Sequence, residues 1–173
     1  MKARTLIFTG EGKGKTTAAL GMVLRAVGHG QKVMVIQFIK SCPDTGELAA
    51  LGRLPGVEVV QKGRGFVPKR DAQKFPKHVT VAREAMALAA ERISGNEYDL
   101  IVLDEVCGAV AYGLIDEAEV LELVRDQRRK GCLVLTGRHA TDGMVMLADT
   151  VTEMRCVKHG YGDGIKAQKG VEM

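Results

Sequence analysis

The 173-residue sequence contains no tryptophan and few other aromatic residues, with three tyrosines and four phenylalanines. An aromatic content of 4% leaves too little ring surface for a protein that binds single strands of nucleic acid by base stacking. The charge imbalance is also small, because 25 basic and 21 acidic side chains give a formal net charge of +4. That balance suits a small anionic ligand and does not indicate a nucleic-acid partner.

The four cysteines include no closely spaced pair, so the sequence lacks the paired-cysteine pattern of a zinc site. Free thiols in a reducing compartment are the simpler interpretation. The sequence has no apolar run that approaches the length of a membrane span, and residues 6–8 are too short for the core of a signal peptide. We therefore expect a soluble, cytoplasmic protein with no membrane partner.

The sequence does contain apolar strand patterns that alternate with helical patterns, over a length typical of one domain, residues 1–173. This order is typical of an α/β fold with a mostly parallel sheet and helices on both faces. The spacing predicts strands at residues 5–8, 32–39, 57–60, 99–103, 132–135 and 150–157. It predicts helices at residues 15–27, 76–93 and 116–130, and a short one near Met144.

The clearest motif is a segment rich in glycine and lysine, TGEGKGKTT, at residues 9–17. It lies between a predicted strand and a predicted helix, which is the context of a phosphate-binding loop. Glycines let backbone N–H groups face an anion, and the helix start adds its dipole. Lys15 supplies a full charge, and the Thr16 hydroxyl is a candidate magnesium ligand. The candidate phosphate-binding residues are Gly10, Glu11, Gly12, Lys13, Gly14, Lys15, Thr16 and Thr17.

This loop is one residue shorter than the usual motif, which places four residues between its first glycine and the Gly-Lys pair. Thr9 occupies the position expected for the first glycine, and Gly10 follows one place late. A plain glycine-rich turn would not require two lysines among three glycines, so phosphate binding is the favoured interpretation. The fold class is then a single phosphate-loop NTPase-like (RecA-like) domain.

A second motif, YDLIVLDE at residues 98–105, ends a predicted buried strand with two carboxylates. Ligand sites in parallel sheets lie at the carboxyl ends of the strands, where the phosphate loop also begins. A solvated acidic turn would explain the pair in isolation. Because a phosphate loop is present in the same chain, we expect Asp104 and Glu105 to hold Mg²⁺ together with Thr16.

Seven strings of the sequence together resemble the ATP:corrinoid adenosyltransferases of cobalamin biosynthesis and salvage, over residues 6–172. They are TGEGKGKTTAALG, GHGQKVMVIQFIK, GRGF, YDLIVLDEV, LTGRHA, ADTVTEM and VKHGYGDGIKAQKGVE. The resemblance implies transfer of the 5′-deoxyadenosyl group of ATP to the Co(I) centre of a corrinoid, with release of inorganic triphosphate. It also implies a flavoprotein electron donor, a homodimer and an ATP molecule whose phosphate chain is bound in reverse.

The resemblance assigns further roles to individual residues. It gives the phosphate loop and Arg25 to ATP, although a plain surface arginine explains Arg25 equally well. It gives Gly65 and Phe66 to a loop that presses on the corrinoid and displaces its axial ligand, and Arg138 to phosphate or a corrinoid side chain. No catalytic side chain is expected, since cobalt is the nucleophile. By this resemblance, many members have a tryptophan where this chain has Pro68, and many have an N-terminal helix over the corrinoid site, which we expect to be missing here.

Two alternatives stay open at this stage. A small kinase or ATPase would need an acceptor site and a base, and the basic cluster Arg125, Arg128, Arg129 and Lys130 more simply ends a solvated helix. A protein that binds nucleotide or corrinoid without catalysis would not need both Lys15-Thr16 and Asp104-Glu105.

Overall fold

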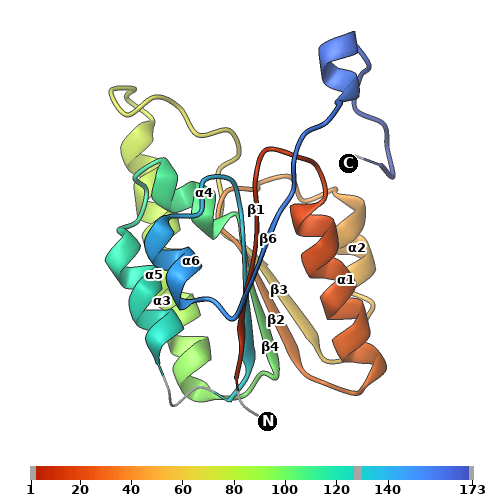
Figure 1. Ribbon diagram of the computed structural model, residues 1–173, viewed down its shortest axis with the longest axis vertical. Coiled ribbons are helices and arrows are strands. Elements are labelled where there is room, and N and C mark those ends of the chain that lie inside the picture. Colours follow the sequence, from red (N-terminus) through yellow and green to blue (C-terminus); the bar gives the residue numbers. More distant parts are fainter. Residues whose placement is uncertain (1–2, 127–129, 172–173) are drawn as a thin grey trace.

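The computed structural model describes residues 3–126 and 130–171 and has a parallel β-sheet at its centre (Figure 1). The described residues form six strands in the order β3-β2-β4-β5-β1-β6, and every neighbouring pair is parallel. The strands are β1 (Thr5–Thr9), β2 (Val33–Gln37), β3 (Val57–Gln61), β4 (Leu100–Asp104), β5 (Cys132–Thr136) and β6 (Thr150–Glu153). The predicted α/β architecture is therefore confirmed.

Helices cover both faces of this sheet, as predicted. They are α1 (Lys15–Gly28), α2 (Gly46–Leu51), α3 (Phe75–Gly95), α4 (Val106–Ala111), α5 (Glu117–Arg125) and α6 (Asp142–Leu147), followed by a 3-10 turn, η1 (Gly160–Asp163). Helices α1 and α2 lie on one side of the sheet, and α3, α4, α5 and α6 lie on the other (Figure 1). Each side has its own cluster of buried apolar residues, with the sheet between them.

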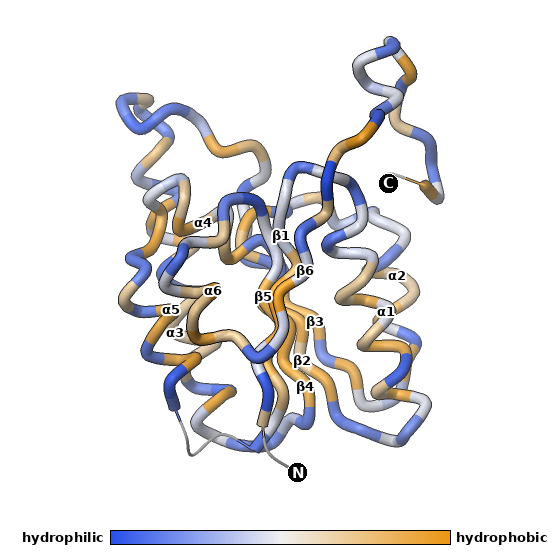
Figure 2. The backbone as a smooth tube through the Cα atoms, in the orientation of Figure 1, coloured by the Kyte–Doolittle hydropathy of each residue, from blue (hydrophilic) through white to orange (hydrophobic). Residues whose placement is uncertain are grey.

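The burial of each strand follows its place in the sheet. All residues of β2 and β4 are buried, because both strands lie inside the sheet and are covered on both faces. These strands form an apolar centre beneath more polar outer helices (Figure 2). Strand β6 lies at the edge and is exposed throughout. The inner strands therefore hold the carboxyl edge of the sheet rigid, and the functional residues follow that edge.

The structure differs from the sequence-based prediction most clearly in two short helices and in the ends of two elements. Helices α2 and α4 were not predicted, because six residues are too few to display a helical period. Strand β6 ends at Glu153 and not at residue 157, because the chain then turns across the phosphate loop. Helix α5 ends at Arg125, where Asp126 takes an extended backbone, and not at Lys130. Arg128 and Arg129, which belonged to the predicted basic helix end, lie outside the described residues.

Among the described residues, no helix is both long and apolar enough to cross a lipid bilayer.

Candidate functional site

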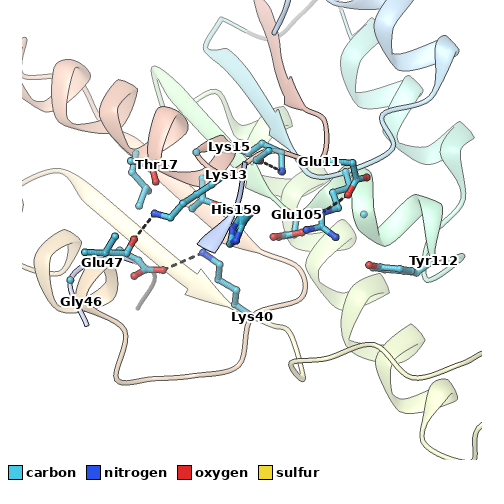
Figure 3. Close-up of a pocket in the computed structure, with 18 residues that line it drawn as sticks. Glu11, Lys13, Lys15, Thr17, Lys40, Gly46, Glu47, Glu105, Tyr112 and His159 are labelled. Atoms are coloured by element: carbon cyan, nitrogen blue, oxygen red, sulfur yellow. Dashed lines mark hydrogen bonds and ion pairs between the residues drawn. The ribbon is translucent and has the colours of Figure 1, made fainter. Parts of the chain in front are cut away.

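A cavity of about 680 Å³ opens at the carboxyl edge of the sheet. It is bounded by the phosphate loop, the segment between β2 and α2, the start of α4, the loop after β5 and the C-terminal segment (Figure 3). Its volume lies within the range of roughly 300–1,000 Å³ found for sites that bind small molecules. The predicted phosphate-binding and metal-binding motifs thus meet around one cavity.

The phosphate loop joins β1 to α1 and presents the start of that helix to the cavity. Gly14 precedes the helix with φ of 117°, a conformation that favours glycine. No side chain of the described residues caps this helix start. The first N–H groups of α1 are therefore directed at the cavity, where they and the helix dipole favour an anion.

Lys15 is held in place by the loop that it belongs to. Its Nζ donates to the carbonyl oxygens of Gly10 and Gly12, each at 2.7 Å. Burial lowers the pKa of Lys15, and the positive charge of Arg138 lowers it further, while Glu105 and Glu11 oppose the shift. The ammonium group thus lies at the cavity wall in a position where an added negative charge would stabilise it (Figure 3).

The first two glycines of the loop are required by a neighbouring backbone. A Cβ atom on Gly10 would lie 2.5 Å from the Met154 carbonyl oxygen, and one on Gly12 would lie 2.7 Å from the same atom. The Gly12 N–H donates to this oxygen at 2.6 Å. The segment that follows β6 therefore packs directly on the phosphate loop. The Gly12 N–H is engaged by protein, although Gly12 itself lines the cavity.

The structure brings the predicted magnesium ligands together. The Thr16 hydroxyl donates to Asp104 Oδ1 at 2.9 Å, across a sequence separation of 88 residues. The Thr136 hydroxyl donates to the same oxygen at 2.7 Å. Asp104 is fully buried and does not itself line the cavity, so these donors fix its carboxylate directly behind Thr16, which does.

Glu105 takes a different direction from Asp104. It has φ of 65° and begins α4, and its N–H donates to the Thr136 hydroxyl at 2.9 Å. Its side chain lines the cavity. Burial raises the pKa of Glu105, and the adjacent Asp104 raises it further, while Lys40, Lys15 and Arg138 oppose the shift.

This donor set fits Mg²⁺ bound beside phosphate. Among the described residues there is no group of three or more acidic, histidine or cysteine side chains that could enclose a metal. Mg²⁺ is usually held by one or two carboxylates together with phosphate oxygens and water, and seldom by an all-protein cage. Thr16, Asp104 and Glu105, placed next to an anion-binding helix start, meet that requirement.

Arg138 lies beside the phosphate loop, and Arg25 does not. Arg138 lines the cavity, and its Nε is 3.3 Å from Glu11 Oε2. Arg25 lies in the last turn of α1 and does not line the cavity. Ten residues of helix separate it from Lys15, or about 15 Å. Its contact with the nucleotide therefore stays a prediction.

Gly65 and Phe66 lie on the loop between β3 and α3, above the carboxyl edge of the sheet (Figure 1). Gly65 has φ of 80°, and its N–H donates to the Ile39 carbonyl oxygen at 2.7 Å. The Phe66 side chain is 92% exposed and does not line the cavity. Neither of these two residues lines the cavity.

Sequence reasoning missed Lys40 and Glu47, whose side chains both line the cavity and form an ion pair there (Figure 3). Lys40 Nζ lies 3.2 Å from Glu47 Oε1 and 3.3 Å from Asp104 Oδ2. Burial disfavours the charge of Lys40, but Asp104 and Glu47 outweigh that effect and raise its pKa. The available signal was the position of Lys40 just after a predicted buried strand, at the edge where ligands bind.

Sequence reasoning also missed the contribution of the C-terminal segment. His159, Gly170 and Val171 line the cavity. Lys13 Nζ donates to the Val171 carbonyl oxygen at 2.6 Å. No sequence pattern of single residues predicts this contact, because it joins positions 158 residues apart.

The sheet order, the phosphate loop and the cavity at its mouth define an α/β phosphate-loop nucleotide-binding protein. The structure resembles a KaiC-like protein, PH0186, from Pyrococcus horikoshii OT3, with a TM-score of 0.60 and 15% sequence identity. The superposed region covers 88% of this chain and 71% of that one. At this identity the likeness concerns the fold alone, and it supports the predicted RecA-like class.

Sequence similarity shows the family to which the chain belongs. The family described as ATP:corrinoid adenosyltransferase BtuR/CobO/CobP matches residues 1–173, and the chain belongs to this family. A corrinoid adenosyltransferase of Pseudomonas aeruginosa is 43% identical over 168 residues, which are 96% of this chain and 82% of that protein. One from Escherichia coli K12 is 39% identical, covering 96% and 84%. A third, from Salmonella typhimurium, is 38% identical, covering 96% and 84%.

Proposed function

We propose that this chain is a transferase that moves the 5′-deoxyadenosyl group of ATP to the Co(I) centre of a corrinoid and releases inorganic triphosphate. One observation carries the proposal: the family matches the whole chain, and in this chain the phosphate loop and Glu105 line one cavity, with Asp104 hydrogen-bonded to Thr16 behind it. A small kinase or ATPase, or a binding protein without catalysis, is disfavoured because all of the relatives named above are adenosyltransferases.

The nucleotide half of the reaction requires charge stabilisation more than a reactive side chain. Co(I) attacks the ribose 5′-carbon, and the leaving triphosphate gains negative charge. Lys15, the loop N–H groups other than that of Gly12, and the start of α1 would stabilise that charge. Thr16, Asp104 and Glu105 would hold Mg²⁺ directly or through water, and the ion when bound supplies further positive charge to the phosphates. Lys13, Lys40 and Arg138 add positive charge at the cavity wall.

The corrinoid half of the proposal concerns the loop with Gly65 and Phe66. An apolar ring that is 92% exposed is available to pack against the flat face of a corrinoid. Contact there would exclude the axial ligand of cobalt and ease reduction to Co(I). Arg138 is placed to contact phosphate or a corrinoid side chain. The family resemblance also supports a flavoprotein electron donor and a homodimer.

The proposal treats residues 1–173 as one domain that works in the cytoplasm. The four cysteines are all free, which fits a reducing compartment.

A spectroscopic assay tests the activity. Anaerobic mixtures of the chain, ATP, Mg²⁺ and chemically reduced corrinoid should develop the absorbance of a cobalt–carbon bond, and light should abolish it. A protein that only binds its ligands would produce no such change. Omitting ATP, with all else equal, is the matched control.

A product assay separates this activity from that of an ordinary phosphate-loop enzyme. Such enzymes cleave ATP at the γ-phosphorus and release ADP. The family resemblance, which includes the shortened loop from Thr9 to Lys15, implies that ATP binds with its phosphate chain reversed, which would expose the ribose 5′-carbon. Phosphorus NMR should then detect one intact triphosphate for each adenosyl group transferred. ADP formed in proportion to turnover would contradict both the reversed geometry and the proposed activity.

A further inference from the structure

A buried glutamine next to the metal-site aspartate has no role in the function proposed so far. Gln37 ends β2, and none of its surface is exposed. Its Nε2 donates to Asp104 Oδ2 at 3.1 Å, and its Oε1 accepts from Gln61 Nε2 at 2.9 Å. Gln61, Gln37 and Asp104 end the neighbouring strands β3, β2 and β4. A directed chain of hydrogen bonds thus runs across three strand ends to the carboxylate.

Asp104 has separate donors on its two oxygens. Oδ1 accepts from the hydroxyls of Thr16 and Thr136. Oδ2 faces the amide of Gln37 at 3.1 Å and the ammonium of Lys40 at 3.3 Å. Because both oxygens are engaged, the carboxylate cannot rotate without breaking contacts on both sides. The donors on Oδ2 therefore help to determine how Oδ1 is presented to Thr16, which lies in the first turn of α1 at the phosphate site.

Asp104 and Gln61 face opposite ends of the Gln37 amide. A glutamine side chain has a donating end and an accepting end, whereas a carboxylate oxygen only accepts. Asp104 Oδ2 therefore takes the NH₂ group of Gln37, and Gln37 Oε1 is left to accept from the Gln61 amide. The contact with Gln61 holds Gln37 in this orientation, in which the buried carboxylate receives a hydrogen bond.

The same end of β2 also holds the loop that carries Phe66. The Lys62 N–H donates to the Gln37 carbonyl oxygen at 3.0 Å, and the Gly65 N–H donates to that of Ile39 at 2.7 Å. A Cβ atom on Gly63 would lie only 2.0 Å from the Ile39 carbonyl carbon. The side chains of Gln37 and Lys40 therefore contact Asp104, while the backbone of the same segment, residues 37–40, holds the Phe66 loop.

We propose that Gln37 is a positioning residue that orients Asp104 for the metal–triphosphate complex, and that Gln61 holds Gln37 in place. Gln37 is fully buried and does not line the cavity, so it acts through Asp104. The inference rests on the proposed use of ATP with a divalent metal, and does not depend on adenosyl transfer. Groups that orient a metal ligand commonly change metal affinity by about 10–100-fold when they are removed.

A binding experiment tests this role without any corrinoid. Gln37→Met keeps the length of the side chain and removes the donor to Asp104. Mn²⁺ binding in the presence of ATP, followed by electron paramagnetic resonance of free Mn²⁺, should weaken about 10-fold. Binding of ATP in EDTA, measured by calorimetry, should stay within about twofold.

Gln61→Met, at a half-buried site, should weaken Mn²⁺ binding by a smaller factor of about 3. Gln31→Met, in the turn between α1 and β2 at the opposite edge of the sheet, is the matched control and should change neither.

Three results would overturn the proposal. One is unchanged Mn²⁺ binding in Gln37→Met. Another is an equal loss of Mn²⁺-dependent and metal-free ATP binding, which would indicate general damage to the fold. If Gln37→Met does not fold, Gln61→Met decides, and unchanged Mn²⁺ binding in that variant rejects the role. Failure of the adenosyl-transfer assay with intact Mn²⁺ effects would instead contradict the proposed function alone.

Discussion

The two halves of the site are built in different ways. On the nucleotide side, Asp104 is fully buried and receives hydrogen bonds from Thr16, Thr136 and Gln37. On the other side, Phe66 is 92% exposed, and its loop is anchored by backbone hydrogen bonds from Lys62 and Gly65. The first region holds side chains in fixed positions, whereas the second presents an apolar side chain to solvent.

This difference indicates that the two sides of the site have different tasks. Charge stabilisation in a transition state is most effective when donors are oriented in advance, which is the arrangement on the nucleotide side. On the proposed function, a large flat ligand such as a corrinoid would instead complete the exposed side when it binds, because an exposed ring gains burial only at that moment. Substitutions on the two sides should therefore have different signatures, and the predictions below use that difference.

Lys15→Ala should have the largest effect on turnover. That effect should arise on the nucleotide side of the site alone. Loss of one charged donor to the leaving triphosphate is expected to lower turnover by about 10³-fold. The fold should persist, because Lys15 lies at the first position of α1 and alanine is a good helix former. The measurement is the rate of cobalt–carbon bond formation at saturating ATP, together with a thermal unfolding curve.

Lys77→Ala is the control for that variant, since Lys77 is an exposed lysine on α3 and away from the cavity. It should retain full activity. Full activity of Lys15→Ala at saturating ATP would contradict the role assigned to the phosphate loop.

Gly63→Ala should loosen the anchor between β2 and the Phe66 loop. The new methyl group would meet the backbone of Ile39 and Lys40, with the nearest atom at 2.0 Å. Because backbone cannot move aside easily, the free energy of unfolding should fall by about 1–3 kcal/mol. Urea unfolding followed by circular dichroism measures this change.

Gly21→Ala is the matched control, because a Cβ atom on this α1 residue would meet nothing within 4 Å. Alanine is favoured over glycine inside a helix, so this variant should be more stable by about 0.5–1 kcal/mol. Similar destabilisation of both variants would mean that the close approach of Gly63 to β2 is not what matters.

The same comparison explains which features of the structure could be predicted from the sequence. Strands β2 and β4 were predicted because continuous apolar runs are typical of buried parallel strands. The proximity of Thr16 to Asp104 was predicted because the phosphate loop and Asp104 both lie at carboxyl ends of parallel strands, which share one edge of the sheet. These features depend on local patterns and on a general rule of sheet topology.

Other features depend on partners that sequence does not reveal. Gln37 and Lys40 matter because β2 lies beside β4, which brings both residues to Asp104. Helices α2 and α4 are too short for periodicity to predict. The sequence also suggested that Gly10 and Gly12 serve phosphate, whereas the structure adds a second reason, the backbone near Met154.

Phe66→Ala should affect the exposed side alone and leave stability unchanged, because the ring is almost entirely in solvent. Loss of one aromatic contact, about 0.5–1.5 kcal/mol, is expected to slow the reaction up to about 10-fold when the corrinoid starts as Co(II). The loss should be much smaller when a strong chemical reductant supplies Co(I). Both rates are measured from the cobalt–carbon absorbance.

Met146→Ala is the control, because Met146 is 85% exposed on α6 and does not belong to the loop. It should change neither rate. Equal losses for Phe66→Ala in the two assays would reject the idea that Phe66 displaces the axial ligand.

Pro68→Trp should have the smallest effect and should act in the opposite direction. Pro68 lies two positions after Phe66, at the place where the family resemblance leads us to expect a tryptophan. A second aromatic ring would add apolar area against the corrinoid, while loss of proline makes the loop less rigid. Because these effects partly cancel, we expect the Co(II)-dependent rate to rise by only about two- to threefold, with the Co(I)-dependent rate unchanged. Combining it with Phe66→Ala isolates the contribution of the new ring. If Pro68→Trp accelerates both assays equally, the added ring acts on binding in general and not on removal of the axial ligand.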